Sequence, residues 1–135
     1  MGYTISQVAE KFNLTKYTIR YYDKEGLLPF VDRSKAGSRE FSDNDLEWLR
    51  VICCLKNTGM PIKQIKQYIG WCLQGDATLE TRKQLFIKHR QEVLKQIADL
   101  QENLKTIDYK LQFYDTLCNI GPSANKAAHT PAAKP

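Results

Sequence analysis

The chain has 135 residues, of which 42% are hydrophobic and 26% are charged, as expected for one globular domain with an appendage. Its net charge of +5 is split between +2 in residues 1–77 and +3 in residues 78–135, so charge alone identifies no partner. No apolar run approaches the roughly 20 residues of a membrane span, and no signal peptide is recognisable, so we expect a cytoplasmic protein without membrane contacts.

Residues 4–24 predict two short helices joined by a tight turn. Thr4 can cap the first helix, with Gln7 completing a capping box, and Thr15 can cap the second. In the second helix the apolar spacing places Ile19 and Tyr22 inside and Lys16, Tyr17 and Arg20 outside. Two short helices with such a turn are typical of a helix-turn-helix.

Residues 29–41 predict a two-stranded wing that carries the basic residues Arg33, Lys35 and Arg39. Ser42 can cap a third helix, which we expect to end at Gly59. Pro61 can begin a fourth helix, since its missing N–H costs little there. We therefore expect a winged helix-turn-helix domain over residues 1–72.

Residues 76–119 predict one long helix that forms a coiled coil. Apolar residues recur there every seven positions in two series, offset by four, which is the pattern of a coiled coil. Such a narrow stripe needs a partner helix, and a second copy of the chain would give a two-fold homodimer. The expected interface residues are Phe86, Val93, Ile97, Leu100, Leu104, Ile107, Leu111 and Tyr114. Residues 121–135 lack apolar periodicity and are expected to form a disordered tail.

The order of these motifs resembles the MerR (mercury-resistance regulator) family of bacterial transcription factors. The matching segments are Tyr3-Thr4-Ile5-Ser6-Gln7-Val8-Ala9, Thr15-x-x-Thr18-Ile19-Arg20-Tyr21-Tyr22-Asp23, Gly26-Leu27-Leu28-Pro29, Arg33 and Arg39-Glu40-Phe41. The resemblance implies a mainly α fold in which a winged helix-turn-helix precedes an antiparallel dimerisation helix. It also implies binding to an inverted-repeat promoter operator and activation by distortion of over-long spacer DNA, with RNA polymerase as a partner and no cofactor.

Eight residues are candidates for DNA contact. Thr15, Lys16 and Tyr17 lie near the start of the expected recognition helix, where side chains reach base edges in the major groove. Backbone contacts are expected from Arg20, Tyr21 and Lys63. In the wing, Arg33 and Arg39 would hold the backbone or enter a minor groove. Structural alternatives stay open for Arg20 as an ion-pair partner of Asp23, for Tyr21 as a core aromatic, and for Lys16 and Lys63 as solvated lysines.

The segment from Ile52 to Ile62 is similar to the branch of the family that responds to aldehydes and other electrophiles, which implies Cys54 as the sensor thiol. Helical spacing places Cys53 towards the core and leaves Cys54 partly exposed. Arg50, one turn earlier, favours the thiolate, whereas Glu47 opposes it. The alternative is that Cys54 is a small packed hydrophobe.

Other readings of the chain remain open. Cys72 and Cys118 of opposite subunits could form a disulfide in an antiparallel dimer, and soft metal binding by cysteines of two subunits would make a metal-responsive regulator. The protein could also be a constitutive repressor without a thiol sensor, or a coiled-coil protein-interaction module. The sequence has no nucleophile with a base and no phosphate loop, so we do not expect an enzyme.

Overall fold

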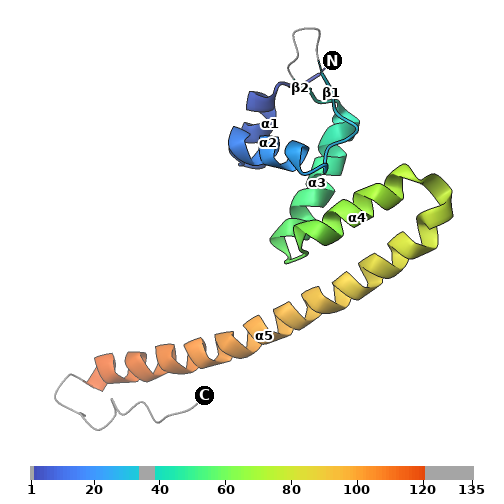
Figure 1. Ribbon diagram of the computed structural model, residues 1–135. Helices are drawn as coiled ribbons and strands as arrows, with labels where there is room; N and C mark the ends of the chain where they lie inside the picture. The colour runs from blue at the N-terminus through green and yellow to red at the C-terminus, as the bar shows by residue number, and fades with distance from the viewer. Residues whose placement is uncertain (1, 34–38, 121–135) are drawn as a thin grey trace. The chain divides into compact units, whose positions relative to one another are not determined.

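The computed structural model describes residues 2–33 and 39–120, which are mainly helical as predicted (Figure 1). Contacts divide the chain into unit 1, Met1–Ile87, and unit 2, Lys88–Pro135. The expected tail over residues 121–135 lies outside the described residues. None of the described helices is both long enough and apolar enough to cross a membrane.

Helices α1 (Ile5–Phe12) and α2 (Lys16–Lys24) lie side by side and begin where their caps predict (Figure 1). Thr4 and Gln7 form the expected capping box, in which each side chain accepts a hydrogen bond from the other residue's backbone N–H. The turn between the helices forms at Asn13, whose φ of 56° lies in the left-handed region that asparagine tolerates. The helix-turn-helix therefore follows from local sequence signals.

The wing is a pair of two-residue antiparallel strands, β1 (Asp32–Arg33) and β2 (Arg39–Glu40). The backbone of Tyr3 extends this ladder, since its N–H donates to the Phe41 carbonyl at 2.7 Å and its carbonyl accepts from Phe41 at 2.9 Å. The side chain of Phe41 is fully buried. The base of the wing is thus held both by the chain's N-terminus and by the core.

Helices α3 (Asp43–Asn57) and α4 (Ile62–Leu73) complete the N-terminal domain. Ser42 caps α3 as predicted. Pro61 is the N-cap of α4 rather than its first helical residue, since its ψ of 147° belongs to extended and not to helical backbone. The fourth helix therefore begins at Ile62 rather than at the proline.

The helix expected from residue 76 begins instead with a 3-10 turn, Gly75–Thr78, and continues as α5 (Leu79–Ile120). Buried Thr78 explains the tighter turn, because its hydroxyl donates to the carbonyl oxygens of Trp71 at 2.6 Å and Gly75 at 3.0 Å. Unit 1 extends into α5, where Leu85 packs against the core and the Phe86 ring meets Tyr68 with centroids 5.2 Å apart.

The four helices α1, α2, α3 and α4 and the base of the wing share one hydrophobic core. Its largest fully buried side chains are Phe41, Ile19, Leu27, Leu28, Leu49, Ile52, Ile65 and Val8. The inward positions predicted for α2 are confirmed, since Ile19 is fully buried and Tyr22 is 5% exposed. This core fixes which face of α2 is left to solvent.

Candidate nucleic-acid interface

The N-terminus of α2 presents polar and aromatic side chains to solvent. The Thr15 hydroxyl accepts a hydrogen bond from the Thr18 backbone N–H at 3.0 Å and shares another with the Thr18 hydroxyl at 2.9 Å. Thr15 is therefore engaged as a helix cap, and its predicted DNA contact would have to coexist with this role. Lys16 and Tyr17 are exposed, and Tyr17 is 76% accessible.

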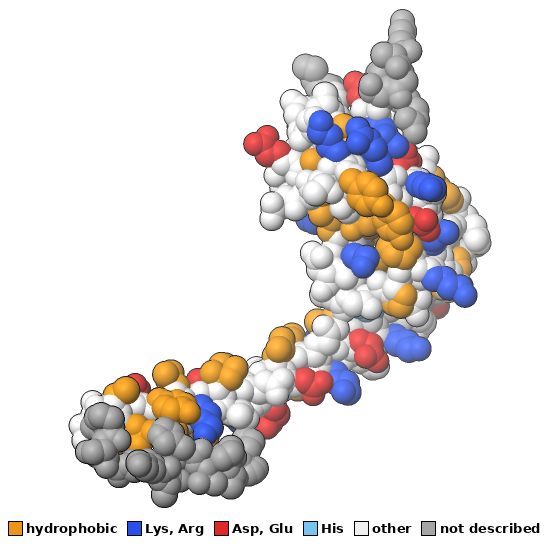
Figure 2. All heavy atoms as spheres, turned by 60° about the vertical axis from the view of Figure 1, so that its left-hand side comes forward, with side chains coloured by type: hydrophobic (Ala, Val, Ile, Leu, Met, Phe, Trp, Pro, Cys, Tyr) orange, Lys and Arg blue, Asp and Glu red, His pale blue; other side chains and the backbone are white. Residues whose placement is uncertain are grey.

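The next turn of α2 continues this outer face. Arg20 is exposed, and Tyr21 is 39% accessible, which removes the alternative of Tyr21 as a fully buried core aromatic. Its ring lies 6.2 Å from the buried ring of Tyr22. On the face of unit 1 that Figure 2 shows, lysine and arginine side chains gather beside exposed hydrophobic surface. Such a surface can meet both phosphates and bases.

Arg39, predicted as a backbone contact, is mostly buried between the wing and α2. Its Nε donates to Asp23 Oδ2 at 2.7 Å, and the two side chains are 19% and 22% exposed. The sequence had offered Asp23 as a partner for Arg20, from one turn earlier in the same helix. This pairing of wing and helix was not predicted, because it depends on how the chain folds back.

The remaining candidates lie on neighbouring elements. Lys63 is exposed in the first turn of α4. The Lys66 ammonium on the same helix lies 3.7 Å from the Glu25 carboxylate at the end of α2. The structure describes the backbone of Arg33 in β1, opposite Arg39, but not its side chain. Lys35 lies outside the described residues.

The adjacent cysteines of α3 have different surroundings, as helical spacing predicts. Cys53 is half-buried against the core, and burial raises the pKa of its thiol, with a smaller contribution from Cys54. Cys54 is exposed. The Arg50 guanidinium, expected to favour a thiolate, instead bonds the Glu47 carboxylate at 2.8 Å. Accessibility rather than a free neighbouring charge therefore distinguishes Cys54.

Cys72 lies in a polar cluster at the end of α4. Burial and a hydrogen bond with Cys72 raise the pKa of Tyr68 to about 12. The Arg82 guanidinium lies 4.0 Å from the Cys72 sulfur and donates to the Gly75 carbonyl at 2.7 Å and the Thr78 hydroxyl at 3.0 Å. Arg82 thereby ties the start of α5 to the end of α4.

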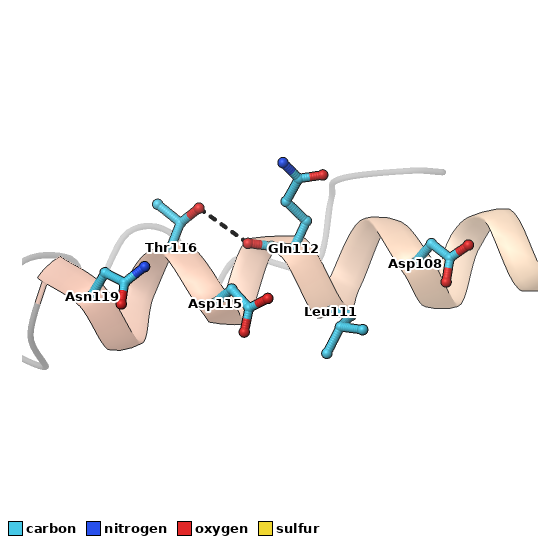
Figure 3. A pocket seen from close by; sticks show the side chains of 6 residues that line it. All are labelled: Asp108, Leu111, Gln112, Asp115, Thr116 and Asn119. Atoms are coloured by element: carbon cyan, nitrogen blue, oxygen red, sulfur yellow. Dashed lines mark hydrogen bonds between the residues drawn. The ribbon is translucent and has the colours of Figure 1, made fainter.

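No residue of α5 is buried in the described single chain, although its apolar positions recur along the whole helix. Figure 2 shows hydrophobic side chains along this helix. Near its end, a shallow depression is lined by Asp108, Leu111, Gln112, Asp115, Thr116 and Asn119. Figure 3 shows Leu111 pointing to the opposite side of the helix from Gln112 and Thr116, so this is open helix surface rather than an enclosed site.

Two family models match the chain. The "MerR HTH family regulatory protein" model matches residues 3–70, and the "MerR, DNA binding" model matches residues 46–109. The chain belongs to the MerR family. This MerR-family protein is therefore a DNA-binding transcriptional regulator, as the motifs of α1, α2 and the wing had indicated.

Curated relatives of this MerR-family protein are regulators. It is 46% identical over 121 residues to an uncharacterised HTH-type transcriptional regulator from Haemophilus influenzae, and the match covers 90% of each chain. It is 37% identical over 91 residues to the HTH-type transcriptional regulator AdhR from Bacillus subtilis, covering 67% of this chain and 65% of AdhR.

Solved structures agree in fold. The crystal structure of HiNmlR, described as a MerR family regulator lacking the sensor domain and bound to promoter DNA, is 47% identical with a TM-score of 0.81. That match covers 86% of this chain and 92% of HiNmlR. A MerR family regulator from Bacillus thuringiensis is 48% identical with a TM-score of 0.79, covering 83% of this chain and 98% of that structure.

Proposed function

We propose that two copies of this regulator bind an inverted-repeat operator in promoter DNA, each through α2 and its wing. The observation that carries the proposal is the outward face of α2, where Lys16, Tyr17 and Arg20 stand exposed on a helix fixed by the core. A helix of this kind fits the major groove and reads base edges from its N-terminal end. The promoter DNA bound to HiNmlR supports the same partner here.

Tyr17 and Lys16 are proposed to contact bases, with Thr15 holding the helix start against the DNA. Arg20, Tyr21, Arg33 and Lys63 are proposed to contact the sugar-phosphate backbone, which sets register rather than sequence preference. Residues 1–72 then act as the DNA-binding domain. Arg39 is left out of these proposed backbone contacts, because its guanidinium is paired with the Asp23 carboxylate.

Residues 76–119 are proposed to form the dimer through an antiparallel coiled coil. We call the expected interface residues of α5 its seam. These positions are open to a partner, since Ile97, Leu100, Ile107 and Leu111 are between 46% and 67% exposed. Residues 79–99 hold five lysines and arginines against three acids, whereas residues 100–120 hold two against three. Antiparallel pairing places the basic half of one helix beside the acidic half of the other, which favours this orientation.

A dimer with two fixed recognition helices can impose a shape on the DNA between them. Activation is proposed to bend and untwist an over-long promoter spacer, so that RNA polymerase meets both promoter elements. Smooth bending of a DNA site of roughly 20–30 base pairs by about 40–90° costs about 1–6 kcal/mol. The contacts of two α2 helices and two wings supply that energy.

Cys54 is proposed as the trigger: its thiolate adds to the electrophilic carbon of an aldehyde or similar compound, the π bond of that carbon breaks, and the resulting anion takes a proton from water. Its exposure next to the half-buried Cys53 supports selective modification. Its carbonyl accepts a hydrogen bond from the Thr58 hydroxyl at 2.7 Å, at the turn that leads from α3 to α4. An adduct there would disturb the turn that sets α4 against α3, and α4 in turn leads to α5.

DNA binding is tested by fluorescence anisotropy on a duplex that the wild-type chain selects from a randomised pool, titrated over a range of salt. Loss of one phosphate contact in Arg20→Ala should lower the slope of log affinity against log salt by about 0.9. Lys95→Ala is the matched control, because it removes the same charge from α5, outside the DNA-binding domain. Equal losses in both variants would mean that α2 has no special role.

The trigger is tested with Cys54→Ser in a promoter-reporter assay with an added unsaturated aldehyde. Cys118→Ser is the matched control, since Cys118 is also exposed but lies at the end of α5. We expect induction to be lost in Cys54→Ser alone. Full induction in Cys54→Ser would remove the sensor role and leave a DNA-binding regulator without this thiol switch.

A further inference from the structure

An acid lies on the helix that should face DNA. Asp23 is one turn after the exposed Arg20 in α2, and a carboxylate beside a polyanion opposes binding by simple electrostatics. Its carboxylate, however, is engaged with the Arg39 guanidinium at 2.7 Å across 16 residues of chain. Both side chains are about four-fifths buried, so solvent screens this pair only in part.

We propose that the Asp23–Arg39 ion pair is a positioning device for DNA binding, which holds the wing at a set orientation to the recognition helix. The proposal rests on the proposed DNA-binding role of α2 and the wing. Asp23 then supports binding in spite of its negative charge. Arg39 acts through Asp23 and not as a phosphate contact.

The geometry of the wing explains why it benefits from such a device. Each of its strands has only two residues, and the bridge between Tyr3 and Phe41 secures its base. Arg39 is the first residue of β2 and is paired in register with Arg33 of β1. Holding the Arg39 side chain against α2 therefore also places the backbone of Arg33, which carries the wing's proposed phosphate contact.

The bond has the properties that such a role requires. A charge-assisted hydrogen bond between guanidinium and carboxylate is directional and is stronger than a neutral one. It joins the end of α2 to the wing directly, whereas the exposed pair of Arg50 and Glu47 joins residues of one helix and orients nothing else. The pair can thus transmit the orientation of α2 to the wing.

The decisive variant is Asp23→Asn in the full chain, because the two readings of Asp23 predict opposite signs. If Asp23 positions the wing, its loss should weaken binding to the selected duplex about tenfold, the loss expected for one charge-assisted hydrogen bond. If Arg39 instead contacts phosphate and Asp23 merely competes for it, the substitution should tighten binding. Glu47→Gln is the matched control, since it removes the same charge from an exposed ion pair.

A second variant keeps the test valid if Asp23→Asn melts at a lower temperature. Arg39→Lys keeps the positive charge and its attraction to phosphate, but it loses the planar donor geometry of the guanidinium. Positioning predicts weaker binding in Arg39→Lys, whereas a phosphate contact predicts nearly unchanged binding. The single variants Asp23→Asn and Arg39→Gln are also compared with the double variant that carries both substitutions. If the two residues act as one pair, the double variant should lose no more DNA affinity than the weaker-binding of the two single variants.

The readout compares the selected duplex with a scrambled duplex of the same base composition. Misplacement of the wing should reduce affinity for the selected duplex more than for the scrambled one, and the folded fraction cannot produce that difference. Unchanged or tighter binding in Asp23→Asn, with Glu47→Gln behaving alike, would overturn the proposal. Failure of the wild-type chain to select any duplex would instead overturn the proposed function.

Discussion

The substitution Leu100→Ala should weaken the proposed dimer by an amount that follows from the exposure of this side chain. It removes three carbon atoms, worth about 0.8 kcal/mol each on complete burial, or about 2.4 kcal/mol together. Since Leu100 is 67% exposed in the single chain, about 1.6 kcal/mol of this is available to a partner. A two-fold dimer contains the site twice, so it loses about 3.2 kcal/mol and its dissociation constant should rise about two hundredfold.

Sedimentation equilibrium over a range of protein concentrations measures this constant directly. Glu102→Ala is the control, because Glu102 is 72% exposed on another face of α5 and its ion pair with Lys105 is of the weak surface kind. Both variants introduce alanine, so neither lowers helix propensity. A monomeric wild-type chain, or equal dissociation constants for the two variants, would refute the assignment of the seam.

Three further predictions concern unit 1. Phe41→Ala should lower the free energy of unfolding by about 3–5 kcal/mol in urea titrations, because this ring is fully buried; a loss below about 1 kcal/mol would show that the site collapses. The pKa of Tyr68 is raised from 10.0 to about 12. The free energy of unfolding should therefore be unaffected below pH 10 and fall between pH 10 and 12, because the unfolded chain loses this proton first. Tyr68→Phe should flatten this fall in urea titrations across that pH range, and an unchanged profile would contradict the shift. Arg82→Gln should speed amide hydrogen exchange in the turn Gly75–Thr78, where Arg82 donates two hydrogen bonds, whereas the neighbouring exposed Lys83→Gln should not; equal rates would exclude the tie.

Helix boundaries in unit 1 could be predicted because capping is a local interaction. Thr4, Thr15 and Ser42 each accept a backbone hydrogen bond from three residues ahead, within reach of a single turn. Pro61 shows the limit, because a proline suits both the cap and the first helical residue, and the choice between them depends on the preceding turn.

The candidate site divides in the same way. Periodicity alone separates buried Ile19 from exposed Tyr17, and half-buried Cys53 from exposed Cys54, because one face of each helix must meet the core. Periodicity cannot say what an exposed or half-exposed charge will meet. Arg39 looks like a wing cation in the sequence and is a partner of α2 in the structure.

The sequence by itself thus determined the helix-turn-helix, the wing and the long helix α5, since each depends on side chains a few residues apart. Only the tertiary structure decided the pairing of Asp23 with Arg39, the bridge of Tyr3 to Phe41 and the 3-10 turn at Thr78. Those contacts join groups from separate elements, and their geometry exists only once the core has set the elements in place.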